Sequence, residues 1–207
     1  MNRAEIRALA RTNLNDTAAT RWTDAELNDW INEGLDQWTL DTNQLPTVGN
    51  PTASADLPLT AFYNAPADAV GIIQVHYQGR LLPRMTLPFW QDWDTQTGTE
   101  PDRIIIGPYG PLKFRLWPYP TADLSASLEV YYVKRPPQLT ADIDVPEMPV
   151  IYHRALAWYA IAAAYLKDAD TASSDLAQAW TARYASRVQD ALTQQPREPL
   201  TVPIIWN

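Results

Sequence analysis

The sequence predicts an α+β protein, in which a helical bundle drawn from both chain ends carries an inserted small antiparallel β subdomain. Both ends of the 207-residue chain repeat apolar residues at helical spacing, whereas the middle alternates β-rich runs with prolines and glycines. A proline-containing apolar tail follows the last helical stretch. We therefore expect a bundle from residues 1–45 and 146–195, a β-rich insert over 56–140, and an extended C-terminal arm over 196–207.

The composition is that of a folded, acidic protein. Hydrophobic residues make up 46% of the chain, and the formal net charge of −8 argues against a broad surface that grips DNA. The chain has no cysteine, which excludes thiol nucleophiles, thiolate zinc sites and iron–sulfur clusters. No signal peptide and no bilayer-spanning apolar run is visible, so we expect no membrane association and a soluble protein made in a cytoplasm.

Two helices are expected near the N-terminus. Residues 3–14 repeat apolar side chains at helical spacing. The second helix begins at Thr23, because Thr23 and Glu26 form a capping box that satisfies two backbone N–H groups, and Trp22 can pack onto Leu27 across the helix start. One face of this helix is apolar and comprises Leu27, Trp30, Ile31, Gly34 and Trp38.

Each of these helices carries a charged stripe. Arginines recur every four residues in the first helix, and carboxylates follow the outer face of the second; the two stripes are Arg3, Arg7 and Arg11, and Glu26, Asp29, Glu33 and Asp36. The stripes are either two solvated faces or complementary surfaces through which neighbouring subunits pair in an assembly.

The middle of the chain predicts several short strands. Residues 45–60 are rich in Pro, Thr, Ala and Asn, so they are expected to form a linker or a long surface loop. A short helical turn is expected over 87–93. Strands are expected at 69–77, 80–82, 103–106, 112–117 and 128–133, with a Gln78-Gly79 turn joining the first two. These strands predict a small antiparallel sheet or sandwich.

Two further helices are expected after a proline-rich connector at 135–149. The helix over 150–167 is alanine-rich, and the helix over 171–194 repeats large apolar residues every four positions. The side chains expected to face inward are Tyr152, Leu156, Tyr159, Ala163 and Leu166 from the first helix, and Leu176, Trp180, Tyr184, Val188 and Leu192 from the second.

The tail over 196–207 contains three prolines, which exclude a helix. Its apolar residues are Leu200, Val202, Ile204, Ile205 and Trp206. The tail either folds back onto its own core or docks on a partner as an extended arm, by strand addition or pocket filling.

The chain offers few residues for chemistry, and we assign no catalytic, metal-binding or cofactor-binding residue and expect no cofactor. His76 and His153 lack metal-ligand spacing, so each is expected to be structural or solvent-exposed. Asp142 and Asp144 lack the glycine and terminal glutamate of a calcium-binding loop. No nucleophile elbow, phosphate-binding loop or dinucleotide fingerprint is present.

The tryptophans of the β-rich insert leave one alternative open. Trp90, Trp93 and Trp117 are compatible with a stacking platform for sugars, as in a carbohydrate-binding or hydrolytic module, although tryptophan in a small β core is the more ordinary interpretation. The first interpretation predicts a saturable sugar ligand whose binding is lost when any of these tryptophans is replaced by alanine.

A series of short motifs runs over most of the chain. They are Trp22-Thr23-Asp24, Ile31-Asn32-Glu33-Gly34, Pro66-Ala67-Asp68, Gly79-Arg80-Leu81-Leu82, Trp90, Trp93, Gly98-Thr99-Glu100-Pro101, Leu116-Trp117-Pro118-Tyr119-Pro120, and Arg135-Pro136-Pro137-Gln138-Leu139-Thr140 with Asp142 and Asp144. Their order resembles that of the head–tail adaptor (connector) proteins of tailed bacteriophages. The chain departs from that pattern at Ala65, where a leucine is common, and in the spacing of Gly98 and Pro101, which is one residue longer than usual.

The resemblance implies a structural virion protein rather than an enzyme. Such adaptors form a homo-oligomeric ring, usually dodecameric, beneath the portal, and DNA passes through it without sequence-specific binding. The implied location is the neck of the virion, with the portal protein and a downstream tail or neck protein as partners. On this chain the resemblance makes residues 196–207 the portal-binding arm and lets the charged stripes register neighbouring subunits. A different ring of the virion, such as a tail-completion or tail-tube protein, is the alternative.

Overall fold

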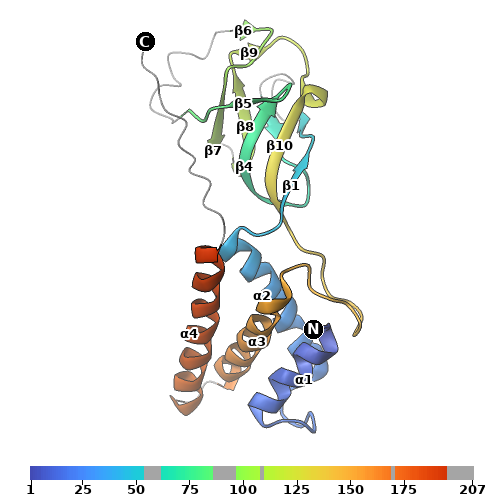
Figure 1. Cartoon of the computed structure of the whole chain (residues 1–207), viewed down its shortest axis with the longest axis vertical. Coiled ribbons are helices and arrows are strands. Elements are labelled where there is room, and N and C mark those ends of the chain that lie inside the picture. The colour runs from blue at the N-terminus through green and yellow to red at the C-terminus, as the bar shows by residue number, and fades with distance from the viewer. Residues whose placement is uncertain (54–61, 86–96, 108–109, 169–170, 195–207) are drawn as a thin grey trace. The chain divides into compact units, whose positions relative to one another are not determined.

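The computed structural model of the chain describes residues 1–53, 62–85, 97–107, 110–168 and 171–194 (Figure 1). It contains four α-helices and antiparallel β-sheets, so the α+β class predicted from the sequence is confirmed. The chain divides into two compact units, Met1–Thr42 with Pro137–Asn207, and Asn43–Pro136. The expected arm over 196–207 lies outside the described residues.

The first unit is helical. Its central helix, α3, contacts each of the other three, so helices from the two chain ends pack together as the sequence predicts (Figure 1). The helices are α1 (Arg3–Leu14), α2 (Asp24–Thr42), α3 (His153–Asp168) and α4 (Thr171–Gln194), with the 3₁₀ turn η4 (Val150–Tyr152) leading into α3. None of the described helices is long and apolar enough to cross a membrane.

Capping boxes set the first two helix starts. Thr23 Oγ1 accepts the Glu26 N–H at 3.3 Å while Glu26 Oε2 accepts the Thr23 N–H at 2.8 Å, which confirms the predicted box. At α1, Asn2 Oδ1 accepts the Glu5 N–H at 2.9 Å and Glu5 Oε2 accepts the Asn2 N–H at 3.0 Å. This second box follows the same spacing, so the signal was present in the sequence.

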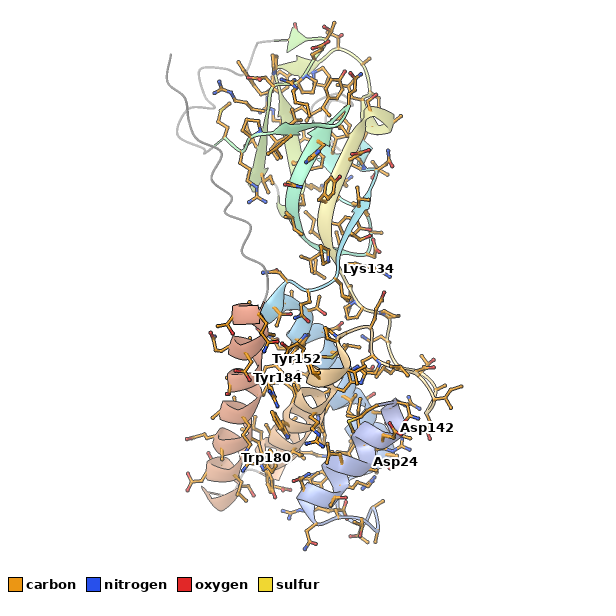
Figure 2. The ribbon with its side chains drawn as sticks, in the orientation of Figure 1. Asp24, Lys134, Asp142, Tyr152, Trp180 and Tyr184 are labelled. Carbon is orange, nitrogen blue, oxygen red and sulfur yellow. The ribbon has the colours of Figure 1, made fainter. Side chains whose placement is uncertain are left out.

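The core of the helical unit is built around the apolar face of α2. Trp38 is buried, and its ring lies 5.0 Å from that of Tyr152 and 6.1 Å from that of Tyr184, so it joins α2 to η4 and to α4 (Tyr152 and Tyr184 are labelled in Figure 2). Two residues predicted to face inward are instead exposed, Leu166 at 64% and Leu176 at 45%. Leu176 belongs to a series with steps of four residues, each of which advances about 40° beyond a 3.6-residue turn, so the end of that series rotates away from the buried face.

The second unit packs two four-stranded sheets against one core. The strand order is β1-β10-β4-β5 in one sheet and β2-β3-β8-β7 in the other, and β6 and β9 form a two-stranded parallel pair. Apolar side chains of both sheets, including Val75, Phe114 and Leu128, are buried together. The strands are β1 (Pro46–Gly49), β2 (Thr52–Ala53), β3 (Phe62–Asn64), β4 (Ala69–Tyr77), β5 (Arg80–Leu82), β6 (Thr97–Gly98), β7 (Arg103–Gly107), β8 (Gly110–Trp117), β9 (Tyr119–Pro120) and β10 (Leu128–Lys134), with the 3₁₀ turn η3 (Ser125–Ser127) before β10.

The prediction of a linker or loop over 45–60 is wrong at Pro46–Gly49 and Thr52–Ala53, which form β1 and β2. β1 is an edge strand that pairs with β10, and Pro46 is tolerated there because it is the first residue of an edge strand. Strands β3, β6 and β9 were not predicted because each has only two or three residues, too few to show alternation. The helical turn expected over 87–93 lies outside the described residues.

The predicted turn between β4 and β5 is confirmed. Gln78 and Gly79 both have positive φ, 50° and 78°, which is the two-residue geometry that matches the twist of antiparallel strands.

Candidate functional site

The arginine stripe of α1 faces the connector that follows the β unit. Arg3 Nη2 donates to Asp142 Oδ1 at 2.9 Å, and Arg7 Nη1 and Nη2 donate to the two oxygens of the same carboxylate at 3.0 and 3.1 Å (Figure 2). Hydrogen bonds from Arg7 and then Arg3 lower the pKa of Asp142 to about 2. The hydrogen bond to Asp142 also raises the pKa of Arg7. These bonds fix the connector to α1.

The third arginine of the stripe is buried at the turn between α1 and α2. Arg11 Nη1 donates to Asp16 Oδ2 at 3.1 Å, Nη2 donates to the Trp22 carbonyl oxygen at 3.0 Å, and the guanidinium also pairs with Asp24. Burial acts to raise the pKa of Asp16, but backbone N–H groups of Trp22, Thr20 and Arg21 and the Thr20 hydroxyl outweigh it, so the pKa is lowered to about 2. The pair therefore holds the start of α2 against α1.

The carboxylate stripe of α2 faces outward and is partly paired within the chain. Glu26 pairs with Lys167, which is the main cause of its pKa of about 2, followed by hydrogen bonds from Thr23. Glu33 Oε1 accepts the Tyr159 hydroxyl at 2.9 Å, and Asp36 Oδ2 accepts the Gln138 amide at 3.3 Å. Asp29 is exposed and forms no ion pair within the described part of the chain.

Among the described residues, the arginine stripe of α1 and the carboxylate stripe of α2 do not pair with each other within the chain. The arginines of α1 are held by Asp16, Asp24 and Asp142 of their own chain, and none contacts the carboxylate stripe of α2. A role of either stripe between subunits stays a prediction.

An exposed apolar segment, residues 143–151, lies immediately before α3 and was not predicted. Its four aliphatic side chains are exposed at 80% (Ile143), 59% (Val145), 69% (Val150) and 63% (Ile151). The segment begins in a fixed loop, because the Asp144 carboxylate accepts the N–H groups of the connector at 2.7 Å each and its carbonyl oxygen accepts the Arg3 N–H at 2.8 Å. The sequence signal was four β-branched residues around two prolines, Pro146 and Pro149, a pattern that more simply predicts a loop.

A second surface feature, the Arg–Trp strip, lies on α3 and α4 and comprises Trp158, Trp180, Arg183 and Arg187. The Arg183 guanidinium stands 4.3 Å from the Trp180 ring centre, and the Arg187 guanidinium stands 5.8 Å from that of Trp158 (Trp180 is labelled in Figure 2). Both tryptophans are only half-buried against the helical core. Trp180, predicted to face inward, therefore lies at the edge of the core.

Both histidines make contacts within the fold. His153 is fully buried at the start of α3, where Nε2 donates to the Met148 carbonyl oxygen at 3.1 Å, and burial lowers its pKa. His76 stacks on Tyr131 at 4.7 Å between ring centres. Within the described residues, no group of three or more metal-ligating side chains gathers.

The structure does not test the alternative of a sugar platform, because only Trp117 of its three tryptophans lies among the described residues. Trp117 ends β8, and the Arg103 guanidinium lies 5.7 Å from its ring centre. Trp90, Trp93 and the arm residues Leu200, Val202, Ile204, Ile205 and Trp206 lie outside the described residues.

Comparison with protein families gives one match that covers nearly the whole chain. The model of the family described as SU10 adaptor protein matches residues 1–204. No curated protein matches the chain.

Proposed function

The chain belongs to the SU10 adaptor protein family, the phage head–tail adaptors, and from this premise we propose that it forms a homo-oligomeric ring between the portal and the tail. In this proposal the ring is dodecameric, the C-terminal arm over 196–207 docks on the portal, and DNA passes through the ring without sequence-specific binding. Membership of the family identifies a structural rather than a catalytic protein, so the sugar-binding alternative is not carried further.

The observation that carries the proposal is the exposed apolar segment. Four branched aliphatic side chains within nine residues are exposed at 59–80% on the helical unit. Leaving such side chains in water forgoes the free energy of burying them, and contiguous exposed apolar patches mark interaction surfaces. A segment held in place by Asp144 and Arg3 is also preorganised, which reduces the entropy lost on docking.

The end of α4 supports a link between this segment and the arm. The Tyr152 hydroxyl donates to Gln194 Oε1 at 2.8 Å, which joins the last residue of α4 to the residue that directly follows the segment. In our proposal the arm anchors, Leu200, Val202, Ile204, Ile205 and Trp206, and the apolar segment engage the portal together. Apolar and aromatic anchors that fill pockets carry most of the energy at such interfaces.

The acidic charge of the chain is compatible with the proposed passage of DNA. A net charge of −8 gives no broad electrostatic attraction for the phosphate backbone. A ring of such subunits would let DNA slide without holding it. The downstream face is proposed to contact a neck or tail protein.

Two variants and one control test the portal contact. We expect removal of residues 196–207, or substitution Ile151→Asp in the apolar segment, to abolish co-sedimentation with purified portal protein. Leu166→Asp is the matched control, because Leu166 is equally exposed in the same unit but lies outside the segment. Portal binding by the truncated protein at the wild-type level would contradict the arm proposal while leaving the ring proposal intact.

The ring itself is tested on particles. Mass spectrometry of purified virions is expected to find this chain at a copy ratio near that of the portal protein, and absence of the chain from the particle would refute the proposed location.

A further inference from the structure

We infer that neighbouring copies of this chain contact each other through the Arg–Trp strip of one copy and the carboxylate face of α2 in the next. This inference rests on the proposed homo-oligomeric ring. The carboxylate face is defined by Asp29, Glu33 and Asp36, with the exposed Leu40 at its C-terminal end.

The Arg–Trp strip is a continuous surface. Arg183 and Arg187 are one helical turn apart, so they are neighbours on α4, and each covers a tryptophan, Trp180 at 4.3 Å and Trp158 at 5.8 Å. Arg183 forms no ion pair within the described residues. Arg187 pairs with Asp190 at 3.1 Å, with both side chains more than 40% exposed, so that pair is weak and exchangeable.

Contact with the tryptophan rings restrains the two arginines while leaving N–H groups free to bind carboxylates. A guanidinium that lies flat on an indole keeps its N–H groups at the edge of its plane, where they match the two oxygens of a carboxylate. Trp and Arg are also the residues that dominate binding energy at protein interfaces when they become buried. The strip therefore has the composition of an interface rather than of an ordinary solvated helix face.

Charge complementarity indicates that the Arg–Trp strip binds a second copy of this chain. The arginine stripe of α1, expected from the sequence to pair with a neighbour, is instead held by Asp16, Asp24 and Asp142 of its own chain. The Arg–Trp strip is a cationic surface whose Arg183 has no such carboxylate among the described residues. Its counterpart on the same unit is the α2 face, which combines carboxylates with an apolar residue, Leu40, that is 53% exposed.

Because the strip and the carboxylate face are different surfaces, we take their contact between neighbouring copies in the proposed ring to be heterologous, and crosslinking separates this from a two-fold dimer. Each copy would present its strip to one neighbour and its carboxylate face to the other, an arrangement that gives a ring when the rotation between copies closes. Within one chain, Arg183 of the strip is too far from Asp29 of the carboxylate face to pair with it. The Tyr184 hydroxyl contacts Asp41 at 2.9 Å, and Asp29 lies about 18 Å farther along α2 at 1.5 Å per residue.

Disulfide crosslinking tests the contact directly, because the chain contains no cysteine. The full-length variant Arg183→Cys/Asp29→Cys, oxidised in the assembled ring, is expected to give a ladder of covalent multimers on a non-reducing gel. Arg183→Cys/Asn13→Cys is the control, because Asn13 is exposed on α1, away from the proposed contact. Absence of multimers, or crosslinks confined to dimers, would overturn the inference.

Charge exchange provides an independent test. Arg183→Glu/Arg187→Glu and Asp29→Lys/Asp36→Lys are each expected to reduce assembly at least about tenfold, whereas their equimolar mixture restores it, because both contacts in an alternating ring are then complementary. Circular dichroism shows beforehand that each variant is folded. A mixture that fails to assemble would overturn the inference.

The wild-type protein separates the two proposals. A wild-type ring that forms no crosslinks refutes only this contact, whereas a wild-type chain that stays monomeric with the portal present refutes the proposed ring and the contact together. If Arg183→Glu/Arg187→Glu assembles normally but loses binding to duplex DNA, the strip is a DNA surface and the inference is wrong.

Discussion

At the scale of single residues, buried charge organises the helical unit. Arg11 and Asp16 are exposed at only 7% and 5%, and the guanidinium is surrounded by Asp16, Asp24 and the Trp22 carbonyl oxygen. Because a buried charge is costly without partners, these contacts act as a unit. They specify how the chain turns from α1 into α2.

Removal of the Arg11 charge is expected to be strongly destabilising. Arg11→Met leaves the Asp16 carboxylate buried without its cation, so we expect a loss of roughly 3 kcal/mol in the free energy of unfolding, measured by urea denaturation. Arg154→Met is the control, because Arg154 is exposed on α3. An equal loss of unfolding free energy in the two variants would show that the buried Arg11–Asp16 pair contributes no more to stability than an exposed arginine does.

The lowered pKa values predict that acid destabilises the protein in two stages. Burial lowers the pKa of His153 below 6.5, so the unfolded chain binds a proton that the folded chain does not, and stability falls as pH drops below about 6.5. Asp16, Glu26 and Asp142 have pKa values of about 2 against 3.8–4.5 when unperturbed. Their contribution is complete above about pH 4.5 and is lost as pH falls toward 2.

Urea midpoints measured from pH 7 to pH 3 check both stages. Asp142→Asn removes one carboxylate and leaves the histidine in place. We therefore expect this variant to lose less stability than the wild type below about pH 4.5 and the same amount between pH 7 and pH 5. A stability that stays constant over this range would contradict both assignments.

At the scale of elements, α2 packs tightly against α3 at Gly34. A Cβ at this position would lie 3.0 Å from three atoms of the Tyr159 side chain. The Tyr159 hydroxyl donates to Glu33, which restricts how far the ring can move aside. Burial and this contact also raise the pKa of Tyr159 to about 12, so the phenol stays a donor at neutral pH.

Gly34→Ala is therefore expected to destabilise the protein although alanine is the better helix former. Overpacking costs typically 1–3 kcal/mol, which exceeds the propensity gain of about 1 kcal/mol. Thermal unfolding measures the difference. Gly71→Ala in β4 is the matched control, because a Cβ there meets nothing within 4 Å, and a loss as large as that of Gly34→Ala would contradict the packing argument.

At the scale of the whole molecule, the two units have separate apolar cores. The two ends of the β unit lie side by side, since the Lys134 N–H donates to the Leu45 carbonyl oxygen at 3.1 Å and Pro46 pairs with Val133. A segment whose ends meet can be inserted into another domain with little loss of chain entropy.

The β unit is accordingly expected to fold by itself. A fragment of residues 43–136 should give dispersed amide signals in NMR and a cooperative thermal transition. Substitution of the buried Phe114 by alanine, at a cost of roughly 3–5 kcal/mol, should abolish that transition. A fragment that shows random-coil spectra would contradict the independence of the unit.

Most helices and the longer strands could be predicted from the amino-acid sequence, because their signals are local. The capping box of Thr23 and Glu26 starts α2 three residues before its apolar face, and the Gln78-Gly79 turn fixes a hairpin between two adjacent runs. It also carried the motifs by which the chain resembles phage head–tail adaptors, a family to which the chain belongs. Each of these signals lies within one element or in the order of elements.

Which charged side chains pair, and which apolar side chains remain exposed, depends on tertiary packing and could not be predicted from local sequence. Arg3 and Arg7 pair with Asp142, more than 130 positions away, and no periodicity within α1 specifies that partner. β1 likewise exists because β10 supplies hydrogen-bond partners from the far end of the insert. Pairing depends on which chain segments the fold brings within a few ångströms, and packing of distant segments, rather than local pattern, sets those distances.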